Sequence, residues 1–199
     1  EAEQRAGVKA RRTAILGGTF DPVHLGHLFV AAEVMDRFGY ERVVFVPTHI
    51  SPHKSEAPQA SSSARLEMLK IAIAEESRFE VESFEIDRMG VSFTIDTIRY
   101  LVNSGTVAGR PGLVVGSDLV DGFETWRDVD EIESSTDITV VQRPGFSSTR
   151  FHRRHRTMEN LGIGISSRKV RARVRTGRAY RHLIPANISE YIELRRLYL

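Results

Sequence analysis

The sequence contains no cysteine and only one tryptophan among its 199 residues. Without cysteine, this chain can form no disulfide, thiolate nucleophile, iron–sulfur cluster or cysteine-ligated zinc site. It also lacks any run of the ~18 to 20 apolar residues that a transmembrane helix needs. Hydrophobic residues make up 41% and charged residues 27% of the chain. This composition is typical of a globular protein and excludes disordered, collagen-like and low-complexity classes.

The first twelve residues, EAEQRAGVKARR, are charged and lack the apolar segment of a secretory signal peptide. We expect residues 1–12 to be disordered or foreign to the native chain. Residues 13–199 are then expected to form one domain. The missing signal favours a cytoplasmic protein without membrane contacts.

The net charge of +2 conceals an uneven distribution of charge. Between Arg143 and Arg181 the chain has twelve basic residues, and Glu159 is the only acidic one. A local basic segment in a nearly neutral protein favours an anionic partner that is smaller than a nucleic acid. Within this segment, we expect the stretch from Arg150 to Arg156 to be a solvated loop.

Short apolar strands alternate with amphipathic helices along the chain. The predicted strands are 13–16, 43–46, 79–86, 113–115, 138–141 and 163–165, and the predicted helices are 27–38, 64–76, 94–102, 167–175 and 185–197. This alternation predicts an α/β, Rossmann-like fold: a doubly wound parallel sheet with helices on both faces, in a single domain. Ligands of such sheets bind at the carboxyl ends of the strands.

The most informative motif is GGTFDPVHLGH, residues 17–27, between the first strand and the first helix. Its two leading glycines let the backbone approach a ligand closely. His24 and His27 stand at the helix start, where unpaired N–H groups and the helix dipole attract anions. Such a pair can donate hydrogen bonds to phosphoryl oxygens as charge develops there. Capping or core histidines, or a metal site, are the alternatives at this stage.

A second motif, ISSRKVR, occupies residues 165–171 at the start of a predicted helix. Ser166 and Ser167 are suited to cap that helix and to contact an anion. Arg168, Lys169 and Arg171 place positive charge in its first turn, which is unfavourable unless an anion binds there. An exposed basic helix face is the alternative.

Both motifs resemble those of a known enzyme superfamily. GGTFDPVHLGH is similar to the HxGH nucleotidyltransferase signature, and ISSRKVR resembles the distal ISSTxxR motif. Other segments resemble bacterial nicotinate-nucleotide adenylyltransferases in the family's order, namely VPTHISPHK, SFTIDT, VGSDL, the region of Trp126 and IPANISEYIELRRLYL. The resemblance extends from Ile15 to Leu199. It departs from the pattern at Arg168, where the family usually has Thr or Ser, and at Ile50-Ser51.

The resemblance implies transfer of the adenylyl group of ATP to nicotinate mononucleotide, with deamido-NAD and pyrophosphate as products, in NAD biosynthesis. His24 and His27 are then the catalytic residues. The residues implied to bind ATP are Gly17, Gly18, Thr19, Gly116, Asp118, Ser166, Ser167 and Arg171, and those implied to bind the pyridine nucleotide are Lys54, Thr94 and Trp126. Mg²⁺ is expected to be held mainly by the ATP phosphates, without a protein metal site.

Several alternatives stay open on the sequence alone. An adenylyltransferase that prefers nicotinamide mononucleotide or phosphopantetheine is the nearest. A nucleic-acid-binding module that uses the basic segment is more distant; it predicts steep salt dependence of binding and leaves the HxGH motif unexplained. The expected partners are therefore ATP and nicotinate mononucleotide, with no nucleic acid and no membrane, and a homo-oligomer is left open.

Overall fold

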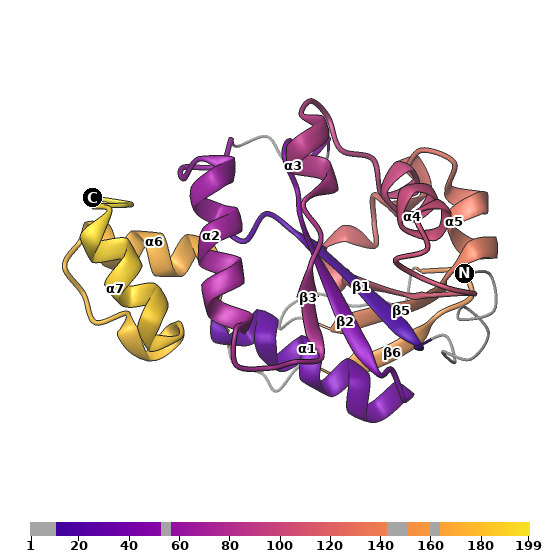
Figure 1. The fold of residues 1–199 in the computed structure, drawn as a ribbon, viewed down its shortest axis with the longest axis horizontal. Coiled ribbons are helices and arrows are strands. Elements are labelled where there is room, and N and C mark those ends of the chain that lie inside the picture. The colour runs from indigo at the N-terminus through magenta and orange to yellow at the C-terminus, as the bar shows by residue number, and fades with distance from the viewer. Residues whose placement is uncertain (1–10, 53–56, 143–150, 160–163) are drawn as a thin grey trace, which may run out of the picture.

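The structure is a computed structural model that describes residues 11–52, 57–142, 151–159 and 164–199. Its described part contains a six-stranded sheet in the order β3-β2-β1-β4-β5-β6 (Figure 1), and all neighbouring strands are parallel. The strands are β1 (Thr13–Gly18), β2 (Arg42–Pro47), β3 (Phe79–Val81), β4 (Gly112–Gly116), β5 (Asp137–Gln142) and β6 (Arg156–Glu159). The chain starts at the centre of the sheet and winds outward in both directions, as in a Rossmann-like fold. The predicted fold class is confirmed.

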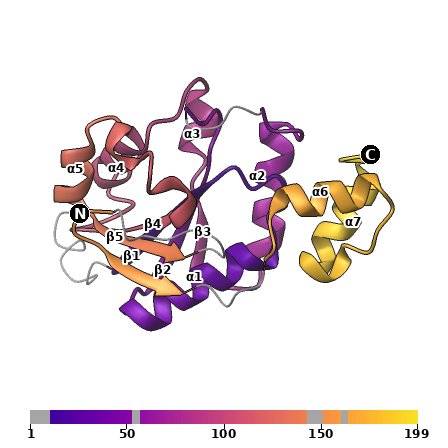
Figure 2. The same ribbon diagram turned by 180° about the vertical axis from the view of Figure 1, so that it is seen from behind.

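Helices cover both faces of the sheet. They are α1 (Leu25–Phe38), α2 (Ser62–Ile73), α3 (Phe84–Arg88), α4 (Thr94–Asn103), α5 (Val129–Ser135), α6 (Ser167–Arg175) and α7 (Ala186–Leu194). Neighbouring residues of β1 point to opposite layers, because Leu16 is buried with side chains of α1 and Ile15 with side chains of α4. Figure 2 shows α6 and α7 together at one end of the molecule, beside α2. None of the described helices combines the length and apolar character needed to span a bilayer.

Local sequence accounts for where several helices begin and end. Gly39 ends α1 in the left-handed conformation, with φ of 67°, and its N–H donates to the Met35 carbonyl. Ser61 caps α2 by accepting from the Ala64 N–H, and Ser166 caps α6 in the same way through the Lys169 N–H. The predicted helix ends at Gly39 and near Ser167 are thus explained by capping.

Two predicted strands were wrong in extent or place, and one helix was missed. The predicted strand 79–86 is the short β3 followed by α3, since Ser83 begins a helix after the alternating residues. Helix α5 was missed, because it is a single short, acidic segment. The last strand is β6, not 163–165; residues 164 and 165 are not in a strand, and residue 163 lies outside the described residues. β6 reads RTME and buries only Met158, so its sequence carries little strand signal.

Most of the N-terminal segment that we expected to be disordered or foreign lies outside the described residues. Residues 1–10 of the expected segment 1–12 are not described. The two remaining residues, Arg11 and Arg12, precede β1, and the Arg12 N–H donates to the Glu41 carboxylate at 2.8 Å.

Candidate active site

The signature loop, residues 17–24, joins the carboxyl end of β1 to α1. Gly18 is paired with Pro47 at the end of β2, and β4 ends beside them at Gly116. Because all the strands are parallel, the loops that follow them lie at one edge of the sheet. The described ends of β1, β2 and β4 therefore lie together at the edge where ligands of such sheets bind.

The two histidines of the signature lie against each other at the start of α1. Their rings are stacked, with centroids 3.6 Å apart and planes inclined by 17°. His24 is the N-cap residue, and its backbone N–H donates to Nδ1 of His27 at 3.2 Å. Since Nδ1 of His27 accepts this hydrogen bond, the ring proton of neutral His27 is on Nε2. In this tautomer Nε2 is the ring nitrogen of His27 that donates hydrogen bonds, and it lies at the electropositive end of a helix.

The glycine between the two histidines leaves room for the His24 ring. A Cβ atom added to Gly26 would lie 3.1 Å from Nδ1 and Cε1 of His24, closer than such atoms normally approach. The His24 ring therefore occupies the space over the first turn of α1 that a side chain at position 26 would take. This explains the G of the HxGH motif, which the sequence analysis did not address.

The distal motif, residues 165–171, packs against the signature loop. Oγ of Ser167 donates to the Pro22 carbonyl at 2.9 Å. Nη1 of Arg171 donates to the Asp21 carbonyl at 2.7 Å. The neighbouring Lys169 instead turns to the Gly164 carbonyl, with Nζ at 2.6 Å. Arg171 is thus a basic side chain of the motif that contacts the signature loop directly.

The other predicted site residues that the structure describes lie on helices or directly after them. Asp118 is exposed on the short 3₁₀ helix η2 (Ser117–Leu119), directly after β4. Thr94 is the first residue of α4. Trp126 follows the 3₁₀ helix η3 (Phe123–Thr125) and packs on Phe123, with ring centroids 4.6 Å apart. Lys54 lies outside the described residues.

The Thr94 and Trp126 segments are joined by contacts between their neighbours. The Arg127 guanidinium lies over the Phe93 ring, 5.0 Å from its centroid, and also reaches the Asp96 carboxylate at 3.5 Å. Phe93 precedes Thr94 and Arg127 follows Trp126 in the chain. The fold therefore brings together the two segments that were assigned to one pyridine-ring site.

Arg65 is a residue of this edge that the sequence analysis missed. It lies on α2 and is fully buried, and its Nη1 donates to the carbonyls of Thr19, at 2.7 Å, and Thr48, at 2.8 Å. Burial lowers the pKa of Arg65, and the negative charge of Asp21 opposes that shift. One guanidinium thus holds both the signature loop and the loop after β2. Its burial is a property of the fold that no local motif indicates.

Glu85 is a second buried ionisable residue near this edge. It lies on α3 and accepts a hydrogen bond of 2.6 Å from Oγ1 of Thr97 on α4. Burial raises the pKa of the Glu85 carboxyl, and the hydrogen bond from Thr97 works against that shift. This contact fixes α3 to the first turns of α4, which begins at Thr94.

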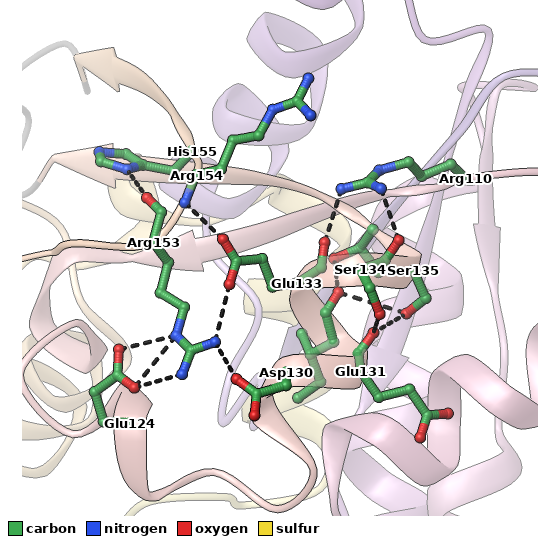
Figure 3. A network of polar contacts seen from close by, with 12 residues as sticks. Arg110, Glu124, Asp130, Glu131, Glu133, Ser134, Ser135, Arg153, Arg154 and His155 are labelled. Atoms are coloured by element: carbon green, nitrogen blue, oxygen red, sulfur yellow. Dashed lines mark hydrogen bonds and ion pairs between the residues drawn. The ribbon is translucent and has the colours of Figure 1, made fainter.

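Part of the basic stretch that we expected to be a solvated loop forms an ion-pair cluster at the surface (Figure 3), and Arg150 lies outside the described residues. The Arg153 guanidinium contacts three carboxylates: Glu124 at 2.7 Å, Asp130 at 2.6 Å and Glu133 at 2.9 Å. Figure 3 also shows the Arg154 side chain turned away from these carboxylates, while its backbone N–H donates to Glu133 at 2.9 Å. For Arg153 the expectation was wrong, because its partners are far away in the sequence.

We expect Arg153 to influence the environment of Trp126. Its partners Glu124 and Asp130 lie before and after Trp126 in the chain. In Arg153→Ala, three carboxylates would face one another without their cation. We expect Trp126 emission to move to longer wavelength and the urea concentration at half-unfolding to fall. Trp126 is the only tryptophan, so intrinsic fluorescence measures both changes. Arg154→Ala is the matched control; equal behaviour of the two variants would refute the role of the cluster.

Comparisons with known proteins show a family and a fold that this chain resembles. The cytidylyltransferase-like family matches residues 15–173. A relative from Geobacillus kaustophilus, named a probable nicotinate-nucleotide adenylyltransferase, is 37% identical and covers 94% of this chain and 86% of its own. A relative of the same name from Salinispora arenicola is 38% identical, and the match covers 92% of this chain and 99% of the relative. Among solved structures, Plasmodium falciparum nicotinic acid mononucleotide adenylyltransferase complexed with NaAD has a TM-score of 0.79 at 17% identity, covering 94% and 97%, a likeness of fold.

Proposed function

Because the chain belongs to the nicotinate-nucleotide adenylyltransferases, within the cytidylyltransferase-like family, we propose that it transfers the adenylyl group of ATP to nicotinate mononucleotide. The products are deamido-NAD and pyrophosphate. The observation that carries the proposal is the stacked pair His24 and His27 at the N-terminus of α1. Together with the distal motif on the signature loop, this arrangement suits a polyphosphate.

The reaction needs no nucleophile from the protein. A phosphate oxygen of nicotinate mononucleotide attacks the α-phosphorus of ATP in line, and the bond from that phosphorus to the bridging oxygen of pyrophosphate breaks. The protein then has to align the two phosphates and stabilise the charge that develops between them. Nε2–H of His27 is a suitable donor for that charge.

The remaining predicted site residues are assigned to three parts of the two substrates. We propose that the signature backbone and the distal motif hold the ATP phosphates, the loop after β4 the adenosine, and the α4 and η3 segments the pyridine ring. The first set is Gly17, Gly18, Thr19, Ser166, Ser167 and Arg171, the second Gly116 and Asp118, and the third Thr94 and Trp126, with Lys54 assigned to a substrate phosphate.

We also propose that Mg²⁺ enters bound to ATP and is held mainly by phosphate and water oxygens. Within the described ranges, no group of three or more His, Asp or Glu side chains is placed to hold a metal ion. The signature's own carboxylate, Asp21, already accepts hydrogen bonds from the Gln59 and Ala60 N–H groups. Within the part of the chain that the structure describes, Asp21 is thus held by backbone N–H donors and does not belong to a metal-ligand group.

Pyrophosphate release from ATP tests the proposed function directly. We expect release with nicotinate mononucleotide and at least tenfold lower kcat/KM with nicotinamide mononucleotide or phosphopantetheine, each supplied in a parallel assay. A hydrogen-bonding site for one polar group discriminates strongly against an analogue that lacks it. Activity with phosphopantetheine alone would overturn the proposal.

A further inference from the structure

The C-terminal end of the chain returns to the signature loop. The hydroxyl of Tyr198, the penultimate residue, donates to Oδ1 of Asp21 at 2.8 Å. Both groups are buried, with 7% of Tyr198 and 2% of Asp21 exposed. Asp21 stands three residues before His24, so this contact links the end of the chain to the loop that presents the histidines.

Asp21 joins the signature loop to three other segments of the chain. Its carboxylate accepts from the N–H groups of Gln59, at 2.8 Å, and Ala60, at 3.1 Å, just before α2. The Arg171 guanidinium of α6 lies 3.6 Å from Oδ2, and Tyr198 supplies the remaining contact. A buried carboxylate is costly unless such donors satisfy it. The donors therefore fix the position of Asp21, and through it the backbone of the signature loop.

The chain after α7 folds back to bring Tyr198 to this position. Arg196 and Tyr198 both adopt the left-handed backbone region, with φ of 53° and 65°, and the Leu197 N–H donates back to the Ile192 carbonyl at 3.0 Å. Side chains other than glycine are disfavoured in that region. Burial of the Tyr198 side chain therefore offsets the unfavourable backbone conformation of the turn, whereas the following Leu199 is exposed.

We propose that Tyr198 is a positioning residue for adenylyl transfer: through Asp21 it holds the signature loop so that His24 and His27 meet the ATP phosphates. This inference rests on the proposed function. It assigns the C-terminal helix and its tail a part in the chemistry as well as in the fold. The hydroxyl stays a donor across the physiological range, since burial and the charge of Asp21 raise the pKa of Tyr198.

Tyr198→Phe removes the hydroxyl and keeps the ring, so the packing of the tail is preserved. We expect kcat/KM to fall about tenfold, because small displacements of a positioning group are costly in rate. Tyr180→Phe is the matched control. Its hydroxyl also donates to a carboxylate, that of Glu193 at 3.0 Å, but this hydrogen bond is exposed and its acceptor lies on α7.

Ring resonances of His24 and His27 provide a second readout that does not depend on turnover. We expect both to shift in the NMR spectrum of Tyr198→Phe and to stay in place in Tyr180→Phe, with His24→Ala and His27→Ala supplying the assignments. Circular dichroism at the assay temperature verifies that the variants are folded. A purely structural role would lower the melting temperature and leave kcat, KM and these resonances unchanged.

The outcomes separate the two proposals. Wild-type protein that turns over while Tyr198→Phe keeps kcat and KM within twofold, with unshifted histidine resonances, overturns the positioning role alone. Wild-type protein that releases no pyrophosphate overturns the proposed function. In that case the NMR comparison still decides whether Tyr198 holds the signature loop. Unshifted histidine resonances in Tyr198→Phe would show that it does not.

Discussion

Replacing His27 with alanine is expected to lower kcat by about 10²- to 10³-fold, the loss found when a preorganised donor to a developing charge is removed. The structure specifies the donor. His24 N–H occupies Nδ1 of His27, so the proton of the neutral ring is on Nε2. The Phe20 ring packs edge-on against His27, with centroids 4.9 Å apart, and further fixes its orientation. Steady-state pyrophosphate release measures kcat.

The matched control for His27 is His182→Ala. His182 is an exposed histidine on the 3₁₀ helix η4 (Arg181–Leu183), next to the C-terminal helix, and its loss should leave kcat unchanged. Circular dichroism and thermal unfolding establish that both variants are folded. Near-normal turnover in folded His27→Ala protein would remove His27 from the mechanism.

Arg65→Met is expected to reduce both stability and activity. Methionine fills part of the buried space but leaves the carbonyls of Thr19 and Thr48 without their shared donor. A hydrogen bond of a charged group contributes about 1.5–3 kcal/mol, so we expect the loss of these two to lower the free energy of unfolding by about 3–6 kcal/mol. Because both loops lose their common anchor, kcat/KM should fall about 10²-fold.

Urea unfolding and steady-state kinetics measure the two effects of Arg65→Met. Lys70→Met is the control on the same helix, since Lys70 is exposed and its substitution adds the same side chain away from the loops. Stability and kcat/KM equal to those of wild type would show that Arg65 does not anchor the loops. A loss of stability with unchanged kcat/KM would limit Arg65 to the fold.

Local patterns were sufficient for the centre of the sheet and much of the site. The apolar run that becomes β2 and the strand–glycine–helix pattern around His24 and His27 are read over a few neighbouring residues. Their partners in the chain are close, so periodicity and capping predict them. Strand β6 and helix α5 were not predicted, because each has a single buried residue: Met158 in β6 and Ile132 in α5.

The sequence by itself determined the fold class, the order of the motifs and the histidine pair, because each depends on residues a few positions apart. Only the tertiary structure decided which polar side chains hold these motifs in place. Arg65, Asp21 and Tyr198 are buried partners from distant segments, and Arg153 is paired across the fold with Glu124. In sequence they look like ordinary polar residues, since burial and pairing arise when separate segments pack together.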